Sequence, residues 1–270
     1  MTTKQNVTFI KGMDFEINFF NEFTPYFKGY SIKQLCLGLN HILFLTTNNE
    51  LYGLGSNDHG ELGLINDNCE DENCNKPVKI KFFLNKNILK IATGFRHSLV
   101  LTEPSIDQNN INTNNMLGKQ YTENNSLENS NNKISENNFN TNNKDNTFND
   151  IYSFGDNAFG QCTGFDTKQF IPKRLFSESE FNPIDIYSGC YHSFTITSEG
   201  DLFSWGDNSY KKLGYSSGSS VVNIPKKVPY LKGYNVGLIG LGEHQSILLT
   251  LKKKESIVDM YYRSTRDIIG

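Results

Sequence analysis

The chain has 270 residues, of which 37% are hydrophobic and 20% charged, with a formal net charge of −3. This length suffices for one sizeable core, and so mild a charge gives no reason to expect binding to nucleic acid or to an acidic membrane. There is no apolar run of about eighteen residues and no apolar signal-peptide core at the start. We therefore expect a cytoplasmic or nuclear protein without a membrane span.

Two short apolar segments open the chain, Val7–Gly12 and Pro25–Phe27. They have no glycine–histidine motif before them, unlike the strands that follow. We interpret them as the degenerate second half of a repeating unit whose complete copies begin near residue 37.

The first complete copy starts at Gly38 and places His41 three residues later. Short segments rich in branched and aromatic residues, bounded by turn residues, predict strands at Ile42–Thr46 and Leu51–Leu54. Asn48 and Asn49 between them predict a hairpin turn. A glycine-rich turn follows, then the polar loop 66–76, and the landmark Pro77 ends the copy.

The same order of motifs returns further along the chain. Gly38 and Gly55 are 17 positions apart (55 − 38), as are Gly189 and Gly206 (206 − 189). Self-similarity at about fifty residues is typical of stacked units that share one core. The recurring landmarks are the motif starts Gly38, Gly94, Gly189 and Gly242, the turn asparagines Asn57, Asn157 and Asn208, and the prolines Pro77, Pro172 and Pro225.

In the second copy an insertion takes the place of the hairpin turn. Residues 104–147 are rich in asparagine and hold little that could form a core, so we expect them to be disordered. A hairpin tip tolerates a long loop at modest entropic cost, which supports the hairpin assignment.

The last copy has a first half, Gly242–Thr250, but no glycine turn after it, and Gln245 stands in the histidine position. One interpretation is that the N-terminal strands complete the blade that these C-terminal strands begin, so that no sheet edge stays free. The alternative for the tail, 251–270, is a short amphipathic helix with Ile257, Val258 and Tyr261 on one face.

These motifs in fixed order resemble the regulator of chromosome condensation repeat family over about residues 35 to 250. The resemblance implies an all-β fold, a β-propeller, whose usual ring in that family has seven blades. Without the insertion about 226 residues are left, which at about fifty per repeat gives four to five blades. We therefore expect one propeller domain over 1–270, with a compact or incomplete ring.

No cofactor or metal is expected. The motif histidines 41, 97 and 192 occupy equivalent places in different blades, so we expect each to bond backbone at the start of its own blade. Cys69 and Cys74 could hold half a zinc site, but no second Cys/His pair lies near them. All five thiols should be reduced inside a cell.

The glycines at 55, 60, 155, 160 and 206 fit turns that need a positive φ better than a phosphate cradle. Lys211 stands where other copies have glycine. If it is left-handed, the lysine costs on the order of 1 kcal/mol, which a shifted turn would avoid.

No Ser/His/Asp or Cys/His constellation stands out, so we expect no covalent catalysis. The variable turn positions hold one register in three blades, where Asp58, His59, Phe159 and Tyr210 are the candidate partner-binding residues. Exposed rings on one rim would favour a protein interface, whereas rings packed over their own blades would not.

The first functional hypothesis is a non-catalytic protein-interaction scaffold, because varied loops would sit on a rigid ring. The resemblance implies a second hypothesis, guanine nucleotide exchange on a Ran-like small GTPase, for which no exchange residue can be placed here. A third is a decayed repeat protein with marginal folding.

Overall fold

The computed structural model describes residues 10–12, 15–17, 24–27, 29–64, 73–104, 148–175, 181–231 and 234–252. Residues 253–270 of the expected tail and nearly all of the insertion 104–147 lie outside these ranges. Among the described residues there is no helix with the length and apolarity needed to cross a membrane.

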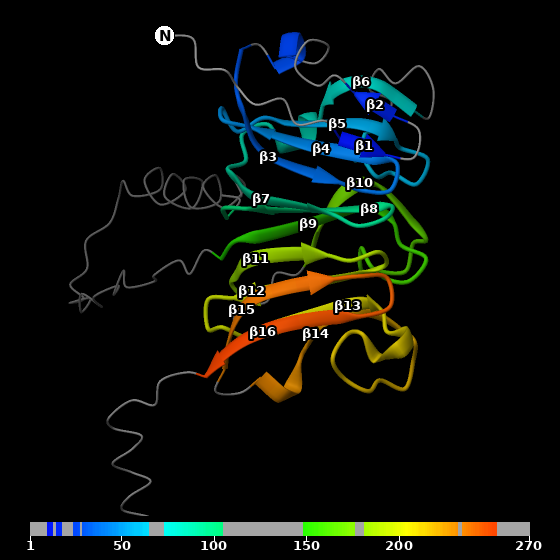
Figure 1. The fold of residues 1–270 in the computed structure, drawn as a ribbon, viewed down its shortest axis with the longest axis vertical. Helices are drawn as coiled ribbons and strands as arrows, with labels where there is room; N and C mark the ends of the chain where they lie inside the picture. Colours follow the sequence, from blue (N-terminus) through cyan, green and yellow to red (C-terminus); the bar gives the residue numbers. More distant parts are fainter. Residues whose placement is uncertain are drawn as a thin grey trace, which may run out of the picture.

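Three four-stranded antiparallel sheets form the body of the molecule, with the order of a propeller blade (Figure 1). Their strands are β3 (Ile32–Leu37), β4 (His41–Thr46), β5 (Leu51–Ser56) and β6 (Asn73–Lys79); β7 (Ile88–Thr93), β8 (His97–Thr102), β9 (Asp150–Asp156) and β10 (Lys168–Leu175); and β11 (Pro183–Ser188), β12 (His192–Thr197), β13 (Leu202–Asp207) and β14 (Val221–Lys227). The all-β propeller fold expected from the sequence is confirmed.

Two smaller sheets flank these blades. β15 (Tyr234–Leu241) and β16 (Ser246–Lys252) form a hairpin in the position of the first two strands of a fourth blade. β1 (Ile10–Gly12) and β2 (Phe15–Ile17) form a separate two-stranded sheet. Four short 3-10 segments complete the described elements: η1 (Thr24–Phe27), η2 (Lys81–Phe83), η3 (Ser209–Lys211) and η4 (Pro229–Leu231).

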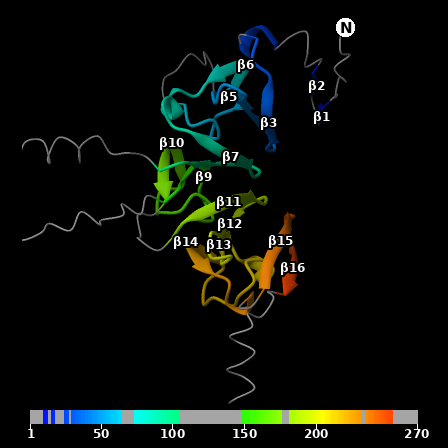
Figure 2. The same ribbon diagram turned by 90° about the vertical axis from the view of Figure 1, so that its left-hand side faces the viewer.

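The sheets follow an open arc, with β1–β2 near one end and β15–β16 at the other (Figure 2). The interpretation that the N-terminal strands complete the C-terminal blade is therefore wrong for the described strands, since the two hairpins belong to different sheets. Within the described ranges three blades have all four strands, so the expected four to five are reached only if the two-stranded sheets are counted.

The core lies between the blades. Leu43 and Leu45 on β4 are fully buried against Ile91, Val100 and Phe154 of the second blade. The next junction joins Leu99 and Leu101 to Ile186 and Trp205 in the same way. Both faces of each sheet carry apolar side chains. A blade therefore buries these side chains only when a neighbouring blade packs on it.

The prolines of the repeat lie in the outermost strands β6, β10 and β14, each within an irregularity of strand pairing. Proline lacks the N–H group that a central strand needs, so it is confined to edges and bulges. The recurrent proline therefore marks the outer edge of each blade.

The insertion leaves from a hairpin tip, as predicted. Thr102 and Asp150, which flank it, are directly paired partners in the β8–β9 ladder. The shorter predicted turns are also confirmed, because Asn49 and Gly200 adopt positive φ of 64° and 81° at the corresponding tips.

Candidate interaction surface

The turn after the third strand of each blade has one construction. The side-chain oxygen of Asn57 accepts from the N–H of Leu62 at 2.9 Å, and its amide donates to the carbonyl of Leu64 at 3.1 Å. Asn157 and Asn208 accept from the equivalent N–H groups at 2.8 and 3.1 Å. Asparagine thus fixes the turn from inside in all three blades.

A glycine at the strand end lets this turn approach the loop before the motif histidine. Gly155 has a φ of 112°, and a Cβ there would lie 2.4 Å from the carbonyl oxygen of Arg96. No side chain fits at that distance, so the two loops of a blade meet at one rim.

The third turn departs from this pattern. Lys211 has a φ of 59°, the left-handed conformation that glycine adopts at this position in the other two turns. The turn is therefore not shifted, and lysine bears the steric cost of that conformation. Tyr210 beside it also has a positive φ, 61°, and is 77% exposed.

The ring side chain of each turn contacts the next blade. Its partner there is the residue just before the motif histidine or glutamine. His59 Nε2 lies 3.5 Å from Arg96 Nη1. The ring centroids of Phe159 and Tyr191 are 5.2 Å apart. Those of Tyr210 and His244 are 5.0 Å apart. The rings therefore pack over the neighbouring blade, which neither expectation from the sequence foresaw.

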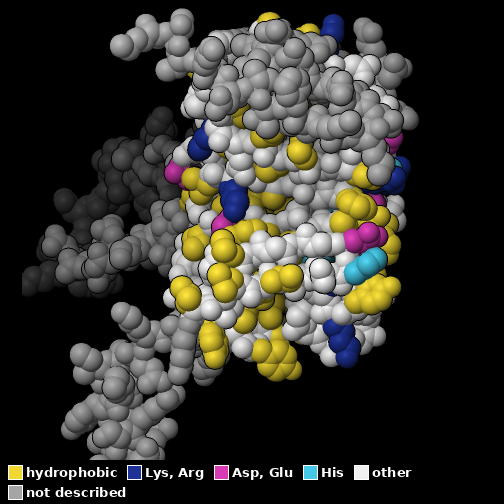
Figure 3. Space-filling model, in the orientation of Figure 1, with side chains coloured by type: hydrophobic (Ala, Val, Ile, Leu, Met, Phe, Trp, Pro, Cys, Tyr) yellow, Lys and Arg dark blue, Asp and Glu magenta, His cyan; other side chains and the backbone are white. Residues whose placement is uncertain are grey.

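These six side chains form a strip along one rim, which we call the rim strip: His59, Arg96, Phe159, Tyr191, Tyr210 and His244. Exposure rises along it, from 23% for the side chain of His59 to 38% for Phe159 and 77% for Tyr210. Figure 3 shows histidine, acidic and hydrophobic side chains side by side at the edge where Figure 1 places the β13–β14 and β15–β16 loops.

The fourth predicted residue, Asp58, serves the strip through its backbone. Its carbonyl oxygen accepts from Lys168 Nζ at 3.1 Å, which ties the first turn to β10 of the second blade. The sequence thus located one half of the strip and missed Arg96, Tyr191 and His244. The available signal was their common place, one residue before the motif histidine or glutamine.

Beneath the strip lies a buried position that differs in charge between blades. Glu61 accepts from the N–H of His59 at 2.8 Å, and burial raises its pKa. Gln161 accepts from the N–H of Phe159 at 2.9 Å. Lys212 instead bonds Asp207 at 2.5 Å and the carbonyl of Glu243 at 2.7 Å. Each turn is therefore anchored by a different group.

The motif histidines join blades. His41 Nε2 lies 3.0 Å from Ser98 Oγ in the second blade, and the Ser98 hydroxyl donates a hydrogen bond to the carbonyl of Glu61 at 2.7 Å. His97 and His192 make the same contact with Ser193 and Ser246, at 3.0 and 3.1 Å. The prediction of a backbone partner in the same blade is wrong, because the imidazole points across the junction.

The motif glycine makes room for that imidazole. A Cβ on Gly38, Gly94 or Gly189 would lie within 2.2 Å of the following histidine ring. A Cβ on Gly242 would lie 3.6 Å from the nearest atoms of Gln245. Burial lowers the pKa of His41 and His97 to about 3 and that of His192 to about 4, so the rings are neutral.

The described part of the chain contains no group of three or more metal-ligating side chains. Cys36, Cys162 and Cys190 are free thiols. Cys74 is disulfide-bonded, so the expectation that every thiol is reduced fails there, and Cys69 lies outside the described residues.

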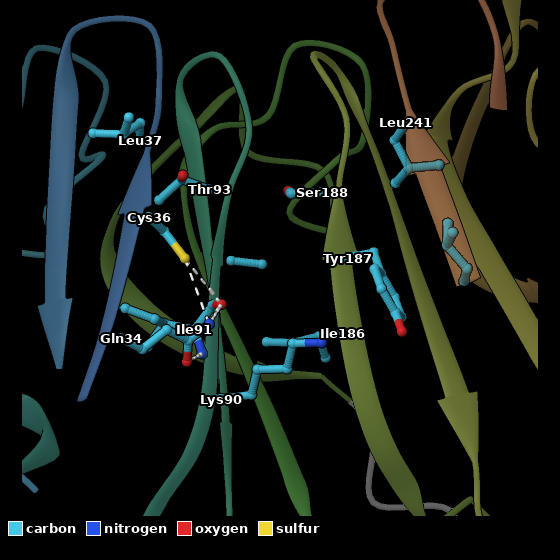
Figure 4. Close-up of a pocket in the computed structure, with 12 residues that line it drawn as sticks. Gln34, Cys36, Leu37, Lys90, Ile91, Thr93, Ile186, Tyr187, Ser188 and Leu241 are labelled. Atoms are coloured by element: carbon cyan, nitrogen blue, oxygen red, sulfur yellow. Dashed lines mark hydrogen bonds between the residues drawn. The ribbon is translucent and has the colours of Figure 1, made fainter. Parts of the chain in front are cut away.

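An open groove of about 330 Å³ runs along the inner strands β3, β7, β11 and β15 (Figure 4). Gln34 and Cys36 both donate to the carbonyl of Ile91, at 2.7 and 3.2 Å, and burial raises the Cys36 pKa to about 11. Lys90 pairs with Asp185 of the third blade. The polar groups of this groove therefore bind one another across blades.

The repeats match two sequence profiles, both described as the regulator of chromosome condensation (RCC1) repeat. One matches residues 48–101 and 199–249, and the other residues 32–61. The matched ranges contain β3–β7, β13–β15, most of β8 and the first part of β16.

The chain is also similar to longer proteins. It is 26% identical over 226 residues to the E3 ubiquitin-protein ligase HERC2 of Homo sapiens, covering 82% of this chain and 4% of that protein. It is 29% identical over 246 residues to a bifunctional serine/threonine-protein kinase/NEDD4-like E3 ubiquitin-protein ligase of Dictyostelium discoideum, covering 86% and 10%. The chain thus spans a tenth or less of these relatives.

A solved structure shows the same fold. In the crystal structure of Kap60 bound to yeast RCC1 (Prp20), a chain aligns with a TM-score of 0.59 at 19% identity, covering 87% of this chain and 45% of that one. The alignment covers under half of that chain, which agrees with the open arc.

Proposed function

Because the chain belongs to the RCC1 repeat family, we propose that it is a non-catalytic protein-interaction scaffold whose partner binds the rim strip. The observation that carries the proposal is the repeated pairing of a turn ring with the next blade's loop, at His59, Phe159 and Tyr210. Aromatic rings held in place by a rigid scaffold lose little entropy on binding and are favoured at protein interfaces.

The chemistry of the strip suits a partner with apolar and polar groups together. Tyr210 and Phe159 offer exposed ring surface, and Arg96 adds a cation beside the half-buried His59. A cytoplasmic or nuclear location is part of the proposal, supported by the free thiols at Cys36, Cys162 and Cys190. The disulfide at Cys74 is the exception.

The test is affinity capture of the tagged full chain from cells, compared with the variant His59→Ala/Phe159→Ala/Tyr210→Ala. Tyr230→Ala is the matched control, because Tyr230 is 80% exposed but follows the outer strand β14, on the connection to β15 at the opposite rim. The proposal expects a partner that the triple variant loses and the control retains. Equal recovery by all three proteins contradicts it.

Half of each sample is treated with EDTA, which strips nucleotide from small GTPases. A GTPase enriched only in that half would favour the alternative function, guanine nucleotide exchange, because an exchanger prefers the nucleotide-free state. A partner indifferent to EDTA favours the scaffold.

A further inference from the structure

The rings of the rim strip are paired in the same way at two successive blade junctions. The Phe159 and Tyr191 rings are tilted by 53° at a centroid distance of 5.2 Å, and the Tyr210 and His244 rings by 55° at 5.0 Å. Phe95 adds a third ring at the first of these junctions, 5.4 Å from Tyr191. Because tilted rings do not cover each other's faces, each junction offers aromatic surface to a ligand.

The polar groups of the strip can donate hydrogen bonds. The hydroxyls of Tyr191 and Tyr210 make no hydrogen bond to another described residue, and the exposed guanidinium of Arg96 carries N–H donors and no acceptor. Of the acids along the strip, Glu61 is 2% exposed, and Glu243 lies at its end, beside the last imidazole. A ligand rich in hydrogen-bond acceptors and poor in N–H groups therefore suits this surface.

A proline-rich segment in the polyproline II conformation has this character. Proline lacks the backbone N–H, so such a segment presents free carbonyl oxygens and few donors of its own. Its pyrrolidine rings dock on aromatic side chains. The segment is also ordered before it binds, which lowers the entropic cost of association.

The spacing of the ring pairs matches the repeat of that helix. Each pair belongs to one blade junction, and packed sheets lie about 10 Å apart, which sets the step from one pair to the next. A polyproline II helix has three residues per turn with a rise of about 3.1 Å, so the same face returns about every 9 Å. Prolines at every third position can therefore meet a ring pair at each junction.

The access to the strip does not depend on where the chain ends. The strip lies along one rim, and any further blade would join an end of the arc, which lengthens the strip without covering it (Figure 2). The insertion leaves between Thr102 and Asp150, at the opposite end of the β8–β9 ladder from His97 and Gly155.

We propose that the partner presents a proline-rich segment in the polyproline II conformation, which lies along the rim strip with its rings against the two ring pairs. The hydroxyls of Tyr191 and Tyr210 and the guanidinium of Arg96 donate to the carbonyl oxygens of the segment. This inference rests on the proposed function, because it names the chemistry of the partner at the same surface.

The probe is a fluorescein-labelled oligoproline of twelve residues, and fluorescence anisotropy measures its affinity for the full chain. A glycine–serine peptide and an oligoglutamate of the same length are the comparison probes. We expect oligoproline to bind at least tenfold more tightly than either. Tighter binding of oligoglutamate, equal binding of all three probes, or no saturable binding of oligoproline at millimolar protein overturns the proposal.

Variants of the strip place the site. Tyr210→Ala and Phe159→Ala should each weaken oligoproline binding at least fivefold, and Tyr210→Phe, which keeps the ring and removes the hydroxyl, by less. The matched control, Tyr230→Ala on the opposite rim, should bind within twofold of wild type, and thermal unfolding shows that each variant is folded. Equal loss in the control, or no loss in the two alanine variants of the strip, contradicts the placement.

The outcome can be separated from that of the capture experiment. A captured partner that the triple variant loses, together with no binding of oligoproline, leaves the scaffold in place and overturns this inference alone. Oligoproline binding that depends on Tyr210 and Phe159, together with a captured partner that the triple variant retains, contradicts the proposed function and supports the polyproline II site.

Discussion

His97 in the second blade places its Nε2 atom 3.0 Å from the hydroxyl oxygen of Ser193 in the third. Both side chains are fully buried, and Ser193 bonds the carbonyl of Gln161 at 3.2 Å. One imidazole thus joins two sheets and the turn between them. The stiffness of the arc, and with it the alignment of the rim strip, depends on such contacts.

Removing that imidazole should destabilise the fold. We expect His97→Ala to lower the free energy of unfolding by about 2 to 3 kcal/mol, since it leaves a cavity and buried polar groups without a partner. His97→Gln should cost about 1 kcal/mol, because glutamine occupies the equivalent place at 245. Urea unfolding checks this, with the exposed His244→Ala as the control expected within about 0.5 kcal/mol of wild type.

The motif glycine should tolerate alanine only where no imidazole packs on it. A Cβ on Gly94 would lie 2.1 Å from the ring of His97 and 2.4 Å from the carbonyl of Gly189. We expect Gly94→Ala to cost about 3 kcal/mol and Gly242→Ala, with 3.6 Å of space, to cost under about 1 kcal/mol. Equal melting temperatures for the two variants would contradict the packing argument.

Acid should weaken the fold through the three buried histidines. Their pKa values of about 3, 3 and 4 lie below the ordinary 6.5, so the unfolded chain takes up protons first. Their contribution to stability is therefore complete above pH 6.5 and is lost as the pH falls from there, towards 4 for His192 and towards 3 for His41 and His97. Each histidine contributes a slope of about 1.4 kcal/mol per pH unit once its unfolded form is fully protonated.

Comparison with His97→Gln isolates this effect from other titrating groups. Urea unfolding between about pH 7.5 and about pH 5 should give a shallower pH dependence for the variant, because one of the three contributions is gone. An unchanged slope would show that His97 does not stay neutral in the folded chain.

Lys211 should be a site of easy stabilisation. Glycine adopts its φ of 59° without the steric penalty of a Cβ, so Lys211→Gly should raise the free energy of unfolding by about 1 kcal/mol. Lys211→Ala keeps the Cβ and should bring no gain. If both variants behave alike, the left-handed conformation is not the source of strain.

Local patterns were enough to predict the second and third strands of the blades and the turns between them. Ile42–Thr46 and Leu202–Trp205 fall within β4 and β13, and the flanks of the insertion pair as a hairpin requires. What failed was contact between blades. His41 and Ser98 are 57 residues apart, and no local periodicity links them.

A signal for that contact was nevertheless present in the sequence. Serine follows His97, His192 and Gln245, whereas Ile42 follows His41 in the first blade. The first blade has no described blade before it to bond its second motif residue, so it needs no serine there. The prediction that the N-terminal strands complete the C-terminal blade was wrong for another reason. A local strand pattern does not tell which sheet the strand will join.

The central claim is that partners bind the rim strip, and site-specific photocrosslinking tests it most directly. A benzophenone amino acid is placed at Tyr210 or, on the opposite rim, at Tyr230, which have similar exposures of 77% and 80%. The account predicts a discrete crosslinked partner from position 210 and none from 230 when living cells are irradiated. A partner captured only from position 230, or equally from both, would contradict it.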